Sequence, residues 1–322
     1  MLLVPGTRHP APGTRHPEPS TQHTAPSTQH PAPDEVRKLL LHLDTSPQPS
    51  VFDRIVAYDA GADEVMSYGG VTADTVRDLV HGAMFTRGPK DLRHTAVFIG
   101  GADMAAGEQL LAAVLGAFFG PMRVSVMLDS NGSNTTAVAA VARLTQAVGD
   151  VRGQRAVVTA ATGPVGLRAA GLLARAGARV AATSRRPHDG ALADRIQRRF
   201  TGAVDEVTMS DSSQAAAALE DAQLLLSAGA AGVRIIPRDA WVGRGLRAAV
   251  DLNAVPPAGV DGIEAQDNGV DRDGTKTFGA LGVGGLKMKI HKACINRLFE
   301  KNDLVLDVET IAEIGRELTQ ST

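Results

Sequence analysis

Short apolar runs alternate with longer segments of helical period in the first half of the chain. Thr95–Gly100 and Arg123–Leu128 consist largely of apolar residues, and the helical patterns Met104–Phe118 and Asn134–Val148 follow them. Such a strand–helix–strand–helix order is typical of a parallel sheet covered by helices. Leu39–Leu43 predicts an earlier element of the same unit. The pattern therefore predicts an α/β fold.

The alternation begins again after a short polar turn. Arg155–Ala160 and Arg179–Ser184 predict strands, and Gly163–Gly177 predicts the helix between them, ending at a glycine. Further strands are expected at Leu224–Ala228 and Arg247–Leu252. A second parallel α/β unit is the simplest interpretation of this half.

The last part of the chain changes character. Gly279–Gly285 is rich in glycine and predicts a loop, Leu286–Glu300 predicts a basic helix, and Val308–Leu318 predicts an amphipathic helix. The predicted divisions are a disordered leader over 1–37, a substrate domain over 38–150, a Rossmann domain over 151–285 and C-terminal helices over 286–322 that pack back on the substrate domain.

The first residues form a degenerate seven-residue repeat over 4–34. The repeat is rich in proline and lacks the apolar positions of a coiled coil, so we expect a low-complexity leader. Its four histidines, His9, His16, His23 and His30, recur at the repeat spacing. Weak metal binding is the alternative interpretation, and no metal site is predicted.

Composition excludes several classes of protein. The formal net charge of −2 gives no basic footprint for nucleic acid. The sequence has no run of about 18 or more uncharged apolar residues, so we expect no transmembrane helix. The single cysteine, Cys294, cannot form an internal disulfide, which favours a cytoplasmic protein.

The turn between Arg155–Ala160 and the next helix resembles a dinucleotide fingerprint. Ala161 stands where G-x-G-x-x-G has its first glycine. The second glycine lets the backbone approach a pyrophosphate, and free N–H groups at the helix start face it. A plain strand–helix turn with packing glycines is the alternative. The residues expected to contact the cofactor here are Thr162, Gly163, Pro164, Val165 and Gly166.

The end of the next predicted strand bears on the choice between NADP and NAD. An acidic residue there would favour NAD, but this chain has Ser184, Arg185 and Arg186. A hydroxyl and two guanidinium groups suit a 2′-phosphate, so NADP is predicted, with NAD possible. Two solvated arginines are the alternative. Further contacts with the cofactor are expected from Ala228, Gly229, Asn253, Gly284 and Gly285.

Longer motifs are spread over both halves of the chain. They are Tyr58–Asp63, Phe85–Gly88, Phe98–Glu108, DSNGSNTT at Asp129–Thr136, the TGPVG turn and Gly279–Cys294. Together they resemble the bacterial NADP-dependent methylene-tetrahydromethanopterin dehydrogenases of methylotrophs. The resemblance implies an α/β protein of two domains, an amino-acid-dehydrogenase-like N-terminal domain and a Rossmann NADP-binding domain, with the active site between them. It also implies a homo-oligomer that oxidises methylene-tetrahydromethanopterin, or methylene-tetrahydrofolate, to the methenyl form.

Acidic and amide side chains at strand ends are candidates to bind the pterin, whose ring carries amide and amino groups. Two lysines lie in the first turns of the predicted basic helix, where positive charge opposes the helix dipole and so indicates a ligand. A helix cap, a turn or a solvated surface is the alternative for each residue. Catalytic roles are predicted for Lys287 and Asp103, and substrate binding for Asp53, Asp59, Thr86, Arg87, Asp129, Asn131 and Lys289.

The expected reaction needs no protein base. The substrate carbon lies between two nitrogens, so a lone pair can expel the hydride, and the enzyme's task is positioning and tuning of charge. Two other interpretations remain open. One is a Rossmann dehydrogenase of a folate, a shikimate-like acid or an amino acid, and the other is an NADP-binding protein without activity.

Overall fold

The computed structural model describes residues 36–320. The predicted repeat leader lies outside the described residues. Two sheets organise the described part, a five-stranded one and a seven-stranded one. None of the helices within residues 36–320 is long and apolar enough to cross a membrane.

The first sheet is parallel throughout and has the strand order β12-β4-β3-β1-β2. Strand β3 is central, between β4 and β1, and β1 pairs with β2 at the edge. Because every pair is parallel, all the carboxyl ends lie at one edge. The strands are β1 (Leu39–Asp44), β2 (Glu64–Tyr68), β3 (Thr95–Gly100), β4 (Ser125–Leu128) and β12 (Val305–Leu306).

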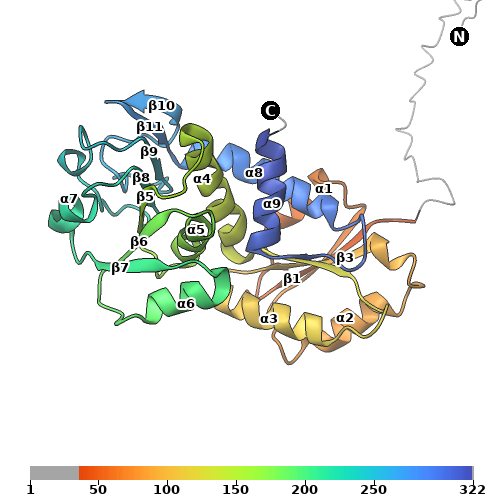
Figure 1. The fold of residues 1–322 in the computed structure, drawn as a ribbon. Helices are drawn as coiled ribbons and strands as arrows, with labels where there is room; N and C mark the ends of the chain where they lie inside the picture. Colours follow the sequence, from red (N-terminus) through yellow and green to blue (C-terminus); the bar gives the residue numbers. More distant parts are fainter. Residues whose placement is uncertain (1–35, 321–322) are drawn as a thin grey trace, which may run out of the picture. The chain divides into compact units, whose positions relative to one another are not determined.

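Helices cover both faces of the first sheet (Figure 1). Because successive side chains in a strand point to opposite faces, Leu40 packs toward α1 and α8, whereas Leu41 packs toward α2 and α3. On β3, Phe98 packs on the same side as Leu40, and Val97 packs on the same side as Leu41. The helices are α1 (Val51–Asp59), α2 (Val76–Met84), α3 (Met104–Gly116) and α8 (Ala280–Arg297).

The second sheet has the order β10-β11-β9-β8-β5-β6-β7, and only β10 is antiparallel to its neighbour. The chain enters at β5 and then builds outward on both sides, so β5 marks a switch point, where ligands gather at the carboxyl ends. The strands are β5 (Arg155–Thr159), β6 (Arg179–Ser184), β7 (Val204–Thr208), β8 (Leu224–Ser227), β9 (Ala248–Asp251), β10 (Asn268–Arg272) and β11 (Thr275–Phe278). The helices α5 (Pro164–Arg175), α6 (Ala191–Phe200) and α7 (Ala215–Ala218) accompany them.

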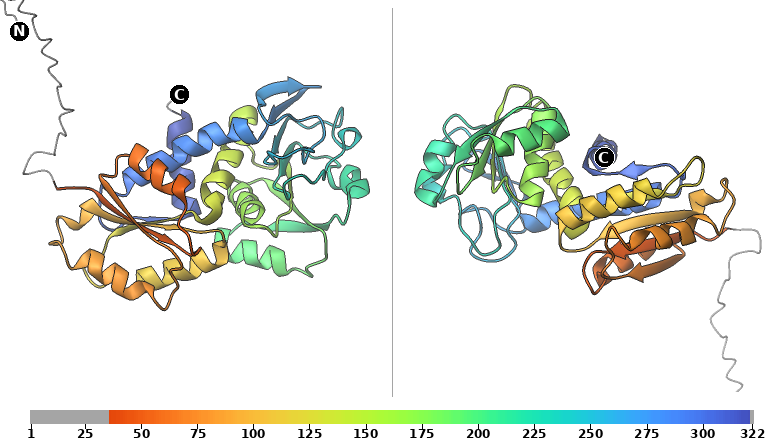
Figure 2. Two further views of the ribbon diagram at one scale, coloured as in Figure 1. Left: turned by 180° about the vertical axis from the view of Figure 1, so that it is seen from behind. Right: turned by 90° about the horizontal axis from the view of Figure 1, so that it is seen from below.

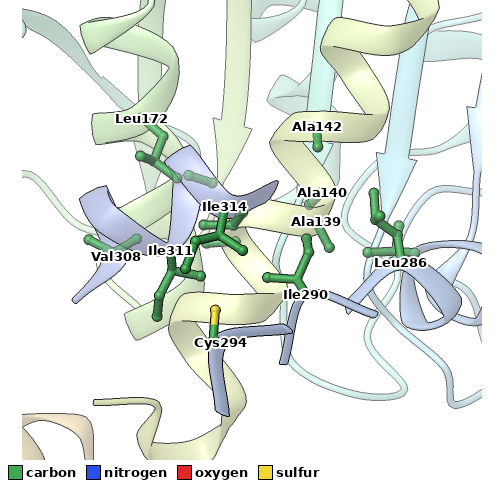
Figure 3. Close-up of a cluster of buried hydrophobic side chains, with 14 of the residues drawn as sticks. Ala139, Ala140, Ala142, Leu172, Leu286, Ile290, Cys294, Val308, Ile311 and Ile314 are labelled. Atoms are coloured by element: carbon green, nitrogen blue, oxygen red, sulfur yellow. The ribbon is translucent and has the colours of Figure 1, made fainter. Parts of the chain in front are cut away.

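Helices α4 (Ser133–Val148), α8 and α9 (Val308–Gln320) join the two sheets (Figure 2). One apolar cluster runs from the first sheet through these helices to the second sheet, and Figure 3 shows its centre. Gly315 of α9 permits the close approach, because a Cβ there would lie 2.7 Å from the Val138 side chain. Short 3-10 helices occur at Leu92–His94, Ser130–Gly132, Ser212–Gln214 and Arg238–Ala240.

A partly buried ion cluster also links the two sheets. Arg168 of α5 is 1% exposed and pairs with Glu108 of α3 at 2.6 Å. Arg199 of α6 pairs with the same carboxylate and, at 2.8 Å, with Asp307 at the start of α9. The Arg168 guanidinium also donates to the Asn134 side chain of α4. Every buried charge in this cluster therefore has an opposite partner.

The α/β fold class predicted from the sequence is confirmed. The loop predicted over Gly279–Gly285 is wrong, because α8 already begins at Ala280. Gly279 and Gly282 lie so close to neighbouring backbone that a Cβ would meet a carbonyl oxygen at 2.0 Å and 1.9 Å. Tertiary packing therefore explains the glycines there. The predicted domain boundaries stay a prediction.

Candidate active site

A cavity of about 360 Å³ opens at the carboxyl edge of the first sheet. We refer to it as the first-sheet cavity. Asp44 is the last residue of β1, Asn131 follows β4, and Lys287 reaches the cavity from α8. Phe52 and Asp53 line it from the start of α1. The structure thus brings together three residues predicted from the sequence, Asp53, Asn131 and Lys287.

Hydrogen bonds hold the segment that carries Asp53. The buried Asp44 carboxylate accepts the backbone N–H of Ser46 at 2.7 Å and that of Ser50 at 3.0 Å. Ser50 in turn caps α1, because its hydroxyl oxygen accepts the Asp53 N–H at 3.2 Å. Asp44 therefore sets where α1 begins and where Asp53 lies.

Charges of both signs meet in the first-sheet cavity. The Lys287 ammonium lies 4.7 Å from the centre of the Phe52 ring. It also lies close to Gly132, since a Cβ there would be 3.2 Å from Nζ. Burial raises the pKa of Asp53, and the positive charge of Lys287 partly opposes this rise. Hydrogen bonds from a ligand would therefore stabilise the charged form of the Asp53 carboxyl group.

Two buried histidines lie near the cavity. His42 is 3.4 Å from Asp44, and His291 is 3.5 Å from Asp129. The Phe98 ring contacts both imidazoles, each at 5.4 Å between ring centres. Burial lowers the pKa of His42, and it lowers that of His291 to about 3. Both imidazoles are neutral near pH 7 and back the cavity without adding positive charge.

A second cavity, also of about 360 Å³, lies at the carboxyl edge of the second sheet. We refer to it as the second-sheet cavity. Thr162 and Gly163 line it where β5 turns into α5, and Ala228 and Gly229 line it after β8. It therefore lies at the switch point of the sheet, where a dinucleotide is expected.

The residues of this turn fit a dinucleotide. Gly163 is the N-cap of α5 and has no side-chain cap, so the helix start is open to an anion. A Cβ on Gly166 would lie 2.5 Å from the Ala160 oxygen, so only glycine permits this approach of helix to turn. Pro164 begins the helix, and the half-buried Val165 follows it. The left-handed residue of the turn is Ala160, with φ 52°, rather than Ala161.

The end of β6 supplies the predicted cations. Ser184 and Arg185 line the second-sheet cavity, whereas Arg186 is exposed beside it. The Ser184 hydroxyl donates to the Arg186 carbonyl at 2.7 Å, which bends the chain after the strand. Its oxygen can still accept a hydrogen bond. This arrangement leaves guanidinium groups at the rim of the cavity.

Thr86 and Arg87 lie at the opposite edge of the first sheet. The Thr86 hydroxyl donates to the Ala83 carbonyl at the end of α2. The Arg87 guanidinium donates to His94 and Thr95, and Thr95 is the first residue of β3. A loop before a parallel strand lies at the amino edge, so neither residue reaches the first-sheet cavity.

Three predicted carboxylates have structural partners. Asp103 caps α3 by accepting the Ala105 N–H at 2.8 Å. Asp59 pairs with Lys292 at 2.8 Å on the surface. Asp129 is 1% exposed and accepts the Thr135 hydroxyl at 2.6 Å, and burial raises its pKa to about 6. None of the three lines the first-sheet cavity.

The remaining predicted residues lie apart from the two cavities. Lys289 and Gly285 line a separate cavity on another face of α8, beside Arg143 of α4. Gly284 lies one turn before Lys287, and a Cβ there would meet nothing within 4 Å. Asn253 joins the loops after β8 and β9, because its side-chain oxygen accepts the Gly232 N–H at 3.2 Å.

Sequence reasoning missed several residues that line the cavities. Asp44 could have been found, because it lies at the end of a strand as Asp129 does. Phe52 carries no signal in the sequence, since an apolar residue at the start of a helix predicts only packing. Ser210, Ser212 and Arg234 line the second-sheet cavity without belonging to any motif. Within residues 36–320, no cluster of three or more His, Cys, Asp or Glu side chains could hold a metal ion.

Comparisons with known proteins add to this geometry. A family model described as methylene-tetrahydromethanopterin dehydrogenase, N-terminal, matches residues 51–131. The bifunctional protein MdtA of Methylorubrum extorquens is 47% identical, covering 88% of this chain and 99% of that protein. The NAD(P)-dependent methylenetetrahydromethanopterin dehydrogenase of the same organism is 32% identical over the same shares.

Solved structures show the same fold at low identity. Shikimate 5-dehydrogenase from Listeria monocytogenes, solved with shikimate and NAD, has a TM-score of 0.53 at 16% identity and covers 86% of this chain and 96% of its own. Ornithine carbamoyltransferase from Pyrococcus furiosus has a TM-score of 0.53 at 13% identity, covering 80% and 83%. These likenesses concern the two-domain α/β architecture.

Proposed function

The chain belongs to the family of methylene-tetrahydromethanopterin dehydrogenases, and on that premise we propose that it transfers a hydride from methylene-tetrahydromethanopterin, or from methylene-tetrahydrofolate, to NADP⁺. It is an enzyme, an NAD(P)-dependent oxidoreductase of one-carbon metabolism. The observation that carries the proposed substrate site is the meeting of Asp53, Asn131 and Lys287 in one cavity at the carboxyl edge of the first sheet.

The cofactor is proposed to bind in the second-sheet cavity. Its pyrophosphate would lie against the open N-terminus of α5 at Gly163, and its adenosine against Ser184 and Arg185. Arg185 and Arg186 favour a 2′-phosphate and hence NADP. When bound, the nicotinamide ring supplies the carbon that accepts the hydride. Gly284 leaves room on α8 for such a ring close to Lys287.

The substrate is proposed to bind in the first-sheet cavity. Asp53 would accept hydrogen bonds from the amino and amide N–H groups of the pterin, and Asn131 can donate or accept at the same edge. Lys287 would donate to the ring oxygen. An ammonium beside the reacting carbon would oppose the cationic methenyl product, so its place is away from that carbon.

No side chain has to take a proton in this scheme. A nitrogen lone pair next to the methylene group stabilises the positive charge as the hydride leaves. The contribution of the protein is then to orient the carbon and to place carboxylate charge near the developing cation. This explains an active site with a carboxyl group, an amide and an ammonium held on three different elements.

The test is an assay of the purified protein with each methylene carrier and each of NADP⁺ and NAD⁺, followed by the absorbance of the reduced nicotinamide. We expect turnover with a methylene carrier and NADP⁺. Asp53→Asn should raise KM for the carrier about tenfold to a hundredfold, because a charged hydrogen-bond acceptor is lost. Asp74→Asn, an exposed loop carboxylate outside the cavity, is the matched control. Silence of the wild-type protein with every pairing would overturn the proposal.

The proposal also covers the cellular location and the oligomeric state of the protein. A cytoplasmic location suits a dehydrogenase with a single, buried cysteine. We also propose a homo-oligomer, as the resemblance to the family implies. Light scattering of the purified protein at several concentrations measures the second property directly, and a monomer throughout would contradict it.

A further inference from the structure

We propose that Phe52 is the surface on which the flat pyrimidinone half of the pterin stacks. The inference rests on the proposed function and adds to it a residue that contacts the face of the substrate, whereas Asp53, Asn131 and Lys287 contact its edge.

The Phe52 ring lines the first-sheet cavity and is 49% exposed. Leaving that much aromatic surface in water forfeits the stabilisation that burial would give. Phe85 and Phe119 are at least as exposed as Phe52, but they contact each other at 5.9 Å between ring centres. Within residues 36–320, Phe52 has no aromatic neighbour of this kind. Its uncovered surface therefore lies in the cavity that a ligand would fill.

The ring is held in place by the segment before it. Phe52 is the second residue of α1, directly after the cap made by Ser50, and Asp44 accepts the Ser50 N–H. A platform that is already ordered loses little entropy when a ligand stacks on it. Asp53 lines the same cavity as Phe52, so a ring stacked on Phe52 can present its N–H edge to that carboxyl group.

Stacking on an aromatic ring adds to simple apolar contact. The Lys287 ammonium lies 4.7 Å from the ring centre, so the Phe52 ring faces the same space as the groups proposed to bind the edge of the pterin. The flat pyrimidinone ring should therefore bind more tightly to Phe52 than to a leucine of similar volume.

The experiment compares Phe52→Leu and Phe52→Tyr with wild type, with Phe85→Leu as the matched control. Phe85 is 60% exposed and lies outside the first-sheet cavity. We expect Phe52→Leu to raise KM for the methylene carrier about three- to tenfold and to weaken inhibition by the methenyl product by a similar factor. Phe52→Tyr should keep the wild-type KM, and the dissociation constant of NADP should not change in either variant.

Several outcomes would overturn the inference. If the wild type turns over and Phe52→Leu has the same KM as wild type, the ring does not stack on the substrate. If Phe52→Leu lowers the thermal midpoint or weakens NADP binding more than Phe85→Leu does, the ring serves the fold. If Phe52→Leu instead lowers the molecular mass in light scattering, the exposed apolar face of α1, which includes Val51 and Ile55, contacts a second copy. A wild type without activity would defeat the proposed function first and is recognised before any variant is compared.

Discussion

Replacing Gly166 by alanine should damage both the fold and cofactor binding. Gly166 lies in the first turn of α5, directly behind the turn that we propose contacts the pyrophosphate. A Cβ there would be 2.5 Å from the Ala160 oxygen and 3.0 Å from the Ala160 carbon and the Ala161 Cα. These are backbone atoms at the end of a central strand, so they cannot rotate away as a side chain can.

The magnitude follows from two opposing effects. Forcing an extra methyl group into a packed contact costs about 1–3 kcal/mol. Alanine is favoured over glycine within a helix by about 0.5–1 kcal/mol, which offsets part of that cost. The net loss of unfolding free energy should therefore be about 1–2 kcal/mol. Any relief of the contact moves α5 away from the turn, so the dissociation constant of NADP should rise about tenfold or more.

Urea denaturation followed by circular dichroism and by the fluorescence of Trp241 measures the stability. Trp241 is the single tryptophan of the chain and is fully buried in the second sheet's core. Calorimetry measures NADP binding. Gly82→Ala is the matched control, because Gly82 lies in α2 and a Cβ there meets nothing within 4 Å, so this change should stabilise by about 0.5–1 kcal/mol.

The two alanine variants should thus shift stability in opposite directions. Equal shifts would mean that helix propensity alone decides the effect and that the 2.5 Å contact does not matter. A Gly166→Ala protein that binds NADP as tightly as wild type would refute the reasoning about the turn, whatever its stability.

Three further predictions concern the arginines after β6, the backbone at Ala160 and the buried His291. The double variant Arg185→Ala with Arg186→Ala should raise KM for NADP far more than KM for NAD, and equal effects would count against the 2′-phosphate assignment. Ala160→Gly should raise the unfolding free energy by about 1 kcal/mol in urea titrations, because φ is 52° there, and a loss of stability would contradict this. His291→Phe should change how the free energy of unfolding depends on pH. Burial lowers the pKa of His291 to about 3, so the unfolded state binds the extra proton below about pH 6.5, and this histidine makes the wild type gain stability as pH rises from 3 to 6.5. The variant lacks this dependence, so as pH falls from 6 to 4 the wild type should lose about 1.4 kcal/mol per pH unit more than the variant does in urea titrations, and parallel curves would refute it.

The regular central strands could be predicted from the sequence, and the edges could not. Thr95–Gly100 and Arg179–Ser184 match β3 and β6 residue for residue, because both faces of these strands are buried and each has an apolar centre. The strand β7, Val204–Thr208, and the hairpin β10–β11 were not predicted. Their residues are largely half-exposed or polar, so no clear period marks them.

Residues of the candidate site could be predicted only where the order of strands and helices already placed them at the carboxyl edge of a parallel sheet. Asp53 and Lys287 are far apart in the sequence, yet helices α1 and α8 both begin at the ligand-binding edge of a sheet. Thr86 and Arg87 were predicted on motif resemblance, and the structure places them at the amino edge. Their loop leads into β3, and a loop that leads into a parallel strand lies at the amino edge of the sheet. The helical Gly279–Gly285 segment was missed because local propensity argues against it, and packing against backbone carbonyls overrides that propensity.

The apolar cluster shared by the two sheets limits how this protein can be recombined. One core contains Ala139 on α4, Leu172 on α5, Ile290 on α8 and Ile311 on α9, so the halves are not independent modules (Figure 3). A chimera that takes the second sheet from the 47% identical relative would need to import α4, α8 and α9 with it. Crossovers inside these helices would leave mismatched surfaces on both sides. Sequence exchange within the family is thus expected to conserve the three joining helices as one block while varying the outer edges freely.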